Sequence, residues 1–164
     1  MKRLRIYLDT SIISFLFADD APEFQKITKD FFNNYLKPKT YDAFISEIVL
    51  KEIEGNTEKI LKDRMLAIVR EYELPSLPLT PESAHLAELY LQECILPRRK
   101  LDDARHVAIA ACNQMDILLS WNFRHLANVP KQRAVKVINE REGFIYPLIM
   151  SSPLEAINEE DKED

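Results

Sequence analysis

Short apolar runs alternate along this chain with longer segments in which hydrophobic residues recur at helical spacing. Three runs, at residues 4–8, 42–46 and 116–120, have the length and the polar boundaries of buried β-strands. Two weaker segments complete the set: ELPSLPLT, with two spaced prolines, contains a brief extended stretch, and IYPLIM has the pattern of a short edge strand. The pattern thus predicts three firm strands and two short ones.

Helices are predicted between these strands, and several carry a recognisable start or end. The expected segments are SIISFLF, residues 20–36 opened by DAPE as a capping box, residues 47–55 closed by Gly55, residues 57–69, residues 80–93 with Thr80 as N-cap and Pro81 at the first position, residues 100–112, and AVKVINEREGF as helical or mixed. Strands separated by helices predict a three-layer α/β/α sandwich around a short, mostly parallel central sheet.

Acidic and amide side chains follow the predicted strands. Asp9 comes directly after the first strand, Glu52 lies in the helix after the second, and Asn122 follows the third. The pair Asp102 and Asp103 begins the helix that leads into that third strand. Because ligands of parallel sheets gather outside the carboxyl ends of the strands, we expect these groups to converge there.

Each acid taken alone has an ordinary explanation. Asp9 could be a turn or cap residue, Glu52 a solvated helix residue, and Asp102 or Asp103 a partner of the helix dipole. Their joint occurrence in this order of strands and helices favours the functional interpretation.

Length and composition fit one globular domain in a reducing compartment. The chain has 164 residues, of which 46% are hydrophobic and 30% charged, and only two cysteines. We expect residues 1–150 to form a single domain, residues 151–164 to form a frayed acidic tail, and the protein to be cytoplasmic, without a membrane segment. The net charge of −5 argues against a surface covered with basic patches, but it leaves room for a locally basic groove.

Four motifs carry a resemblance to a known family. IYLDTSIIS, ISEIVLKEIEG, DARHVAIAA and LLSWNFRHL occur in this order between residues 4 and 138. Together they resemble the PIN-domain nucleases, which include VapC-like toxins. The resemblance implies a compact α/β/α sandwich in which a cluster of acids binds Mg²⁺ or Mn²⁺ and cleaves RNA. It implies that Asp9, Glu52 and Asp103 are catalytic and hold the metal together with Asn122, which stands where the family often has a fourth acid.

The family motif distinguishes the two neighbouring aspartates. Its third part reads D-A-x-x-x-A-x-A, which fits when the first position is Asp103 and fails when it is Asp102. At about 100° per residue, Asp103 shares a helix side with His106, whereas Asp102 faces elsewhere. We therefore expect Asp103 to bind the metal and Asp102 to cap the helix or to support a bound water.

Substrate contacts are expected next to these acids. Ser11 matches the family's small polar residue after the first acid, and Arg99 lies about one helical turn before Asp103; both are predicted to bind substrate. For four further candidates a structural role is the favoured interpretation: Lys100 and Lys131 as solvated charges, and His106 and His125 as structural histidines. Arg105 and Arg124 stay open as phosphate contacts, and Trp121 is more often a packing residue than a platform for base stacking.

Two functions of different class are compatible with these residues. The first is a metal-dependent endoribonuclease, with the toxin of a toxin–antitoxin pair as one case, so that RNA and an antitoxin protein are the expected partners. The second is a catalytically weak PIN-like module that binds nucleic acid or protein, for which Asn122 in place of an acid is the only hint. A haloacid-dehalogenase-type phosphatase fails because Ser11 stands where its second aspartate is required. A homodimer is also expected, because Phe31, Phe32 and Tyr35 offer more aromatic surface than one helical stripe buries.

Overall fold

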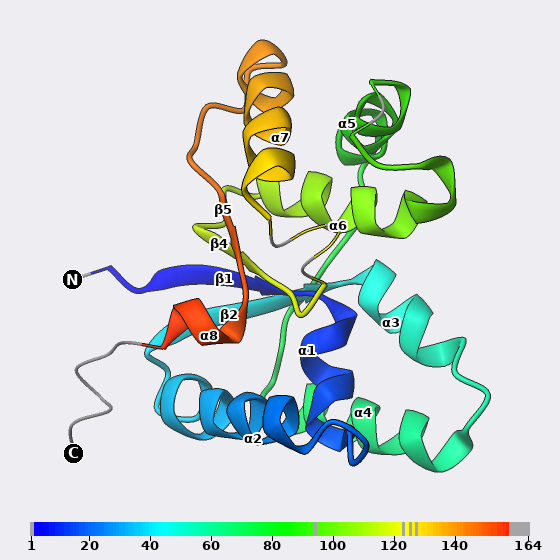
Figure 1. The fold of residues 1–164 in the computed structure, drawn as a ribbon, viewed down its shortest axis with the longest axis vertical. Helices are drawn as coiled ribbons and strands as arrows, with labels where there is room; N and C mark the ends of the chain where they lie inside the picture. The colour runs from blue at the N-terminus through cyan, green and yellow to red at the C-terminus, as the bar shows by residue number, and fades with distance from the viewer. Residues whose placement is uncertain (1, 94, 123, 125, 127, 158–164) are drawn as a thin grey trace.

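The structure, a computed structural model, describes residues 2–93, 95–122, 124, 126 and 128–157. Its centre is a sheet of five parallel strands in the order β3-β2-β1-β4-β5 (Figure 1). The strands are β1 (Leu4–Leu8), β2 (Tyr41–Ser46), β3 (Ser76–Leu77), β4 (Ile117–Leu119) and β5 (Ile149–Ser151). The predicted parallel sheet is confirmed, including both short strands at its edges.

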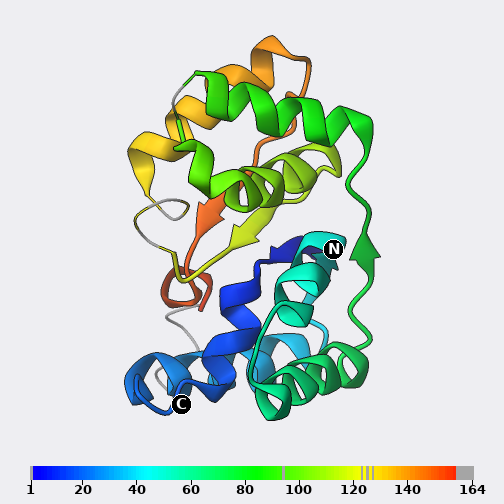
Figure 2. The same ribbon diagram turned by 90° about the vertical axis from the view of Figure 1, so that its right-hand side faces the viewer.

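Helices cover both faces of the sheet, as Figures 1 and 2 show. One layer holds α1 (Thr10–Ser14), α2 (Pro22–Phe31) and α4 (Lys59–Glu71), and the other holds α5 (Pro81–Gln92), α6 (Leu101–Cys112) and α7 (Val129–Arg141). Helix α3 (Glu47–Glu54) contacts α1, α4 and α6, and the short α8 (Pro153–Ala156) contacts α2. The predicted three-layer sandwich is therefore confirmed.

The central strand is buried along its second half because neighbours cover it on every side. Ile6, Tyr7 and Leu8 are fully buried between β2 and β4 and between the two helical layers. Such continuous burial explains why β1 is a run of large side chains rather than an alternating pattern. In α6, small residues such as Ala104 and Ala108 are fully buried and let the helix pack closely on α5.

Some predicted helix boundaries are confirmed and one is wrong. Thr80 caps α5 in a reciprocal capping box with Ser83, and Gly55 is the C-cap of α3. The expected capping box at DAPE does not form, because α2 begins one residue later, with Ala21 as its N-cap and Pro22 at its first position. Alanine has no side-chain acceptor, so α2 starts without a side-chain capping hydrogen bond.

The aromatic residues that suggested a dimer are buried within the chain. Phe31, Phe32 and Tyr35 are 0%, 2% and 4% exposed, because a π-helical turn at Phe32–Leu36 extends α2 and brings these rings onto the core. The rings of Phe31 and Tyr35 also stack on Tyr41 of β2. The argument that these aromatic residues form a dimer surface is therefore wrong. The homodimer stays a prediction that these residues do not support.

The packed part of the chain extends past residue 150. Met150 and Ser151 pair with β4, and the Tyr41 hydroxyl donates to the Ala156 carbonyl over 2.9 Å. Residues 151–157 thus belong to the fold, contrary to the tail boundary predicted at residue 151, and residues 158–164 lie outside the described residues. Within the described part of the chain, no helix has the length and apolar character needed to cross a membrane.

Candidate active site

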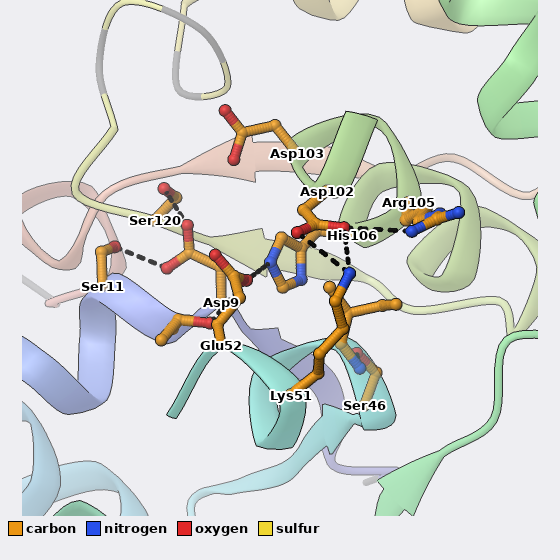
Figure 3. Close-up of polar contacts among 12 residues, drawn as sticks. Asp9, Ser11, Ser46, Lys51, Glu52, Asp102, Asp103, Arg105, His106 and Ser120 are labelled. Atoms are coloured by element: carbon orange, nitrogen blue, oxygen red, sulfur yellow. Dashed lines mark hydrogen bonds and ion pairs between the residues drawn. The ribbon is translucent and has the colours of Figure 1, made fainter. Parts of the chain in front are cut away.

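The candidate site lies at the carboxyl ends of β1, β2 and β4. Asp9 follows β1, Ser46 ends β2 and begins α3, and Ser120 follows β4. Helix α3 carries Glu52 toward Asp9, and the first turn of α6 supplies Asp103 from above (Figure 3). Strands β2 and β3 lie on one side of β1 and β4 and β5 on the other, so the site stands where the strand order reverses, a usual place for ligands in such sheets.

Asp9 is a buried carboxylate held by two hydroxyl groups. It is 4% exposed; Ser11 donates to its Oδ1 over 2.5 Å and the Ser120 hydroxyl donates to its Oδ2. Burial raises the pKa of Asp9, and the charge of Asp103 adds to that rise, while His106 and the two serines act in the opposite direction. Burial, and not repulsion from Asp103, is thus the principal cause of the raised pKa.

Ser11 makes two hydrogen bonds within the site. Its hydroxyl donates to Asp9 and accepts the backbone N–H of Trp121 over 2.9 Å. Both contacts are internal, so the Ser11 hydroxyl supports Asp9, and its contact with substrate stays a prediction.

Glu52 receives two hydrogen bonds on a single oxygen. Thr10 Oγ1 donates to Oε1 over 2.9 Å, and His106 Nε2 lies 2.6 Å from the same atom. Burial alone would raise the pKa of Glu52, but the hydrogen bond and charge of His106, helped by Thr10, outweigh it and lower that pKa.

His106 is almost fully buried in α6 and lies between two polar neighbours. Its Nδ1 is 2.5 Å from the Tyr7 hydroxyl, and the exposed fraction of the residue is 1%. Burial would lower the pKa of His106, but the hydrogen bond to Glu52 and the nearby charges of Asp9, Glu52 and Asp103 raise it. A hydrogen-bonded structural histidine was the favoured interpretation, and its direct contact with Glu52 was not foreseen.

The two neighbouring aspartates have separate surroundings. Asp103 Oδ2 accepts from the Asn122 amide over 3.3 Å. Asp102 points to the other side, where its carboxylate lies 3.2 Å from both Lys51 Nζ and Arg105 Nη1 (Figure 3). Asp102 makes no N-cap hydrogen bond, since α6 begins without a side-chain cap.

The predicted metal ligands have suitable chemistry but do not form a ready-made cluster. Carboxylate and amide oxygens are the donors that Mg²⁺ and Mn²⁺ prefer. Among the described residues, however, no three His, Cys, Asp or Glu side chains are grouped closely enough to hold one ion. Each carboxylate instead has protein partners of its own: the serines for Asp9, His106 and Thr10 for Glu52, and Asn122 for Asp103.

A polar cleft of about 320 Å³ opens beside Glu52 and Asp103. It is lined by Lys51, Glu52, Arg99, Lys100, Leu101, Asp102, Asp103 and Arg105. Arg99 thus lies where it was expected, on the same cleft as two of the acids. An anion in this cleft would meet basic groups on α3, on the Arg98–Lys100 turn and on α6.

The remaining predicted contacts divide. Lys131 donates to the carbonyl of Ile95, so its ammonium group has a partner within the fold. Arg124 is exposed. Trp121 is 6% exposed, packs on Phe24 and donates from Nε1 to Thr28, so it is a packing residue as the favoured interpretation held. His125 lies outside the described residues.

Several residues that support the acids were not predicted, because only contact reveals them. Thr10, Ser120 and Tyr7 touch Asp9, Glu52 or His106 directly. Ser120 could have been found from the sequence, because it stands at the end of a predicted strand, as Asp9 does. Tyr7 had none, because a tyrosine within a buried strand is ordinary core.

Comparison with known proteins gives matches in structure and none in sequence. No protein-family model and no curated protein sequence matches the chain. A crystal structure of VapBC2 from Rickettsia felis bound to a DNA fragment from its promoter matches with a TM-score of 0.53 at 15% identity, over 91% of this chain and 98% of that chain. A structure of VapBC-5 from Mycobacterium tuberculosis, a member of the VapBC family of toxin–antitoxin systems, gives 0.46 at 13% identity, over 90% and 98% of the two chains. The chain therefore has the α/β/α fold of PIN-domain proteins that its four motifs predicted, shared with VapBC2 over almost its whole length.

Proposed function

We propose that this protein is a metal-dependent endoribonuclease that acts as the toxin of a toxin–antitoxin pair. The observation that carries the proposal is that Asp9, Glu52 and Asp103 all lie at the carboxyl end of the sheet, with Glu52 and Asp103 on a cleft that Arg99 also lines. The shared fold with VapBC2 supports the proposal, because the VapBC family is described as one of toxin–antitoxin systems.

The residues divide the work of phosphodiester hydrolysis. Asp9, Glu52, Asp103 and the Asn122 amide oxygen would hold Mg²⁺ or Mn²⁺, and the bound ion would lower the pKa of a water and neutralise phosphate charge. Ser11 and Ser120 keep Asp9 oriented by donating to its two oxygens. Arg99 binds an RNA phosphate in the cleft, as guanidinium groups commonly do.

The test is cleavage of a mixed-sequence RNA by the purified protein in Mn²⁺ and in EDTA. Asp103→Asn should abolish cleavage, and Asp102→Asn, the matched change one residue away, should leave substantial activity because Asp102 is directed at Lys51 and Arg105. Cleavage that is equal in EDTA, or an active Asp103→Asn protein, would contradict the proposal.

A second candidate is a PIN-like binding module with little catalysis. It is favoured by Asn122, which replaces an acid and whose amide group is occupied with Asp103. RNA binding in EDTA by a protein that never cleaves in Mn²⁺ would select this candidate. Co-purification with the product of a neighbouring gene would test the antitoxin partner independently.

A further inference from the structure

We propose that His106 is a positioning residue for Glu52 and that it is itself held by a buried chain of hydroxyl groups, Ser46 and Tyr7. The proposal rests on the endoribonuclease function above, in which Glu52 holds the metal. It assigns a joint role to three residues that lie within the motifs but that the motifs do not connect to one another.

The chain of contacts is continuous and short. Ser46 Oγ lies 2.6 Å from the Tyr7 hydroxyl, which lies 2.5 Å from His106 Nδ1, and His106 Nε2 lies 2.6 Å from Glu52 Oε1. Ser46, Tyr7 and His106 are between 0% and 1% exposed. Water therefore cannot replace a lost partner at these positions, and each contact depends on the others.

The chemistry of the end group fixes one direction in this chain. A carboxylate only accepts hydrogen bonds, so His106 Nε2 carries the hydrogen and donates to Glu52. In the neutral ring this leaves Nδ1 as an acceptor for the Tyr7 hydroxyl, which in turn accepts from Ser46. Ser46 is anchored as well, since its Oγ accepts the N–H of Ile48 over 3.1 Å as the N-cap of α3.

The result is a carboxylate with one oxygen fixed from two sides. Thr10 and His106 both donate to Oε1 of Glu52, and no described residue donates to Oε2. This arrangement fixes the plane of the carboxylate and leaves Oε2 available for a ligand. The donors come from α1 and α6, so Glu52 on α3 is oriented by the two elements that follow Asp9 and carry Asp103.

The first experiment compares two buried tyrosines. Tyr7→Phe removes the hydroxyl that holds His106, and Tyr90→Phe is the matched control. Tyr90 is fully buried and donates to Asn139 of α7, so each variant loses one buried hydroxyl, which makes two hydrogen bonds in Tyr7 and one in Tyr90. Mn²⁺ affinity is measured by calorimetry without RNA, and kcat and KM are measured with RNA.

Tyr7→Phe should weaken Mn²⁺ binding and lower kcat by about tenfold to a hundredfold, the usual effect of losing a group that orients a metal ligand. KM should change little, and Tyr90→Phe should alter neither Mn²⁺ affinity nor kcat although it lowers the melting temperature. His106→Gln, whose side-chain amide can donate from near the position of Nε2, should keep more activity than His106→Phe. Wild-type affinity and kcat in Tyr7→Phe, or equal losses in the two tyrosine variants, would overturn the proposal.

A ring-nitrogen measurement separates this proposal from the proposed function. In ¹⁵N NMR spectra of the wild type, the His106 Nε2–H should exchange slowly with water, and exposed His85 provides the fast-exchanging reference in the same spectrum. Fast exchange at His106 would overturn the proposal whatever the activity. Slow exchange in a protein that neither binds Mn²⁺ nor cleaves RNA would refute the nuclease and leave the hydrogen-bond chain standing.

Discussion

Asp102 and Asp103 differ in what their charge does, although they are adjacent. A step of about 100° around α6 turns Asp103 toward Asn122 and Asp102 toward Lys51 and Arg105. Asp102 thereby forms ion pairs with two cations that line the cleft. Its carboxylate restrains the basic groups in the absence of a ligand, which explains a second acid at a helix start where one would suffice for the dipole.

Removing the charge of Asp102 should strengthen RNA binding. In Asp102→Asn, Lys51 and Arg105 become available for phosphates, so affinity in EDTA should rise by about two- to fivefold at low salt, the range of exposed ion pairs. The salt dependence should steepen, by about 0.7 in log–log slope for each new phosphate contact with single-stranded RNA. Fluorescence anisotropy with a labelled RNA across a salt series measures both.

Asp30→Asn is the control for net charge. It removes one acid that pairs with Lys26 on α2, over 2.9 Å, and should leave RNA affinity unchanged. Equal effects of Asp30→Asn and Asp102→Asn would show that only the overall charge matters.

Among the elements, α6 contributes residues both to the candidate site and to the hydrophobic core. Its first turn holds Asp103, and its remaining length packs small residues against α5. This close packing fixes how far the acids stand from α3. Such close packing makes α6 sensitive to changes in side-chain volume, because protein interiors are packed as densely as organic crystals and have no room for extra methyl groups.

Enlarging a buried alanine of α6 should therefore destabilise the protein. Ala108 is fully buried, and Ala108→Leu should lower the free energy of unfolding by about 1–3 kcal/mol through overpacking. Urea denaturation followed by circular dichroism measures the change. Ala67→Leu, at an exposed position of α4, is the matched control and should be nearly neutral; a neutral Ala108→Leu would mean that α5 and α6 are loosely packed.

The elements also show how far sequence pattern reaches. Strands such as β1 and the cap at Thr80 are determined by residues that are close in sequence, and they were predicted correctly. The π-helical turn at Phe32–Leu36 was not, because its cause is the fit of distant rings onto Tyr41. In the site, the acids followed from family motifs and strand ends, but the link from Tyr7 through His106 to Glu52 joins positions up to 99 residues apart and leaves no local signal.

At the scale of the whole molecule, charge and burial are unevenly distributed. The chain carries a net charge of −5, yet four basic residues, Lys51, Arg99, Lys100 and Arg105, line one cleft together with three acids. This gathering of basic groups on an acidic protein offers a polyanion a local point of attraction. One continuous core connects this cleft to the opposite end of α6, where Cys112 lies.

Cys112 should report whether that core stays closed. Burial raises the pKa of its thiol to about 12, so about one thiol in ten thousand is ionised at pH 8, compared with about a quarter in an unfolded chain whose thiol pKa is about 8.5. In a Cys94→Ser background, alkylation by iodoacetamide at pH 8 should be at least about a hundredfold slower than in guanidinium.

Because the thiolate is the reactive form, the rate should rise about tenfold per pH unit between pH 8 and 10, as long as the protein stays folded. Mass spectrometry follows the reaction. Rapid alkylation of the native protein at pH 8 would show that the Cys112 region opens frequently.

The position of β5 has a consequence for the order in which the protein can mature during synthesis. All the acids of the site and their supports precede β5 in the chain, whereas β5 and α8 close the outer edge of β4 and return to Tyr41. A growing chain folds from its N-terminus, so β4 stays unpaired on its outer side until β5 has been synthesised. A nascent chain therefore carries the acids of the site and their supporting residues before it carries the strand that pairs with β4.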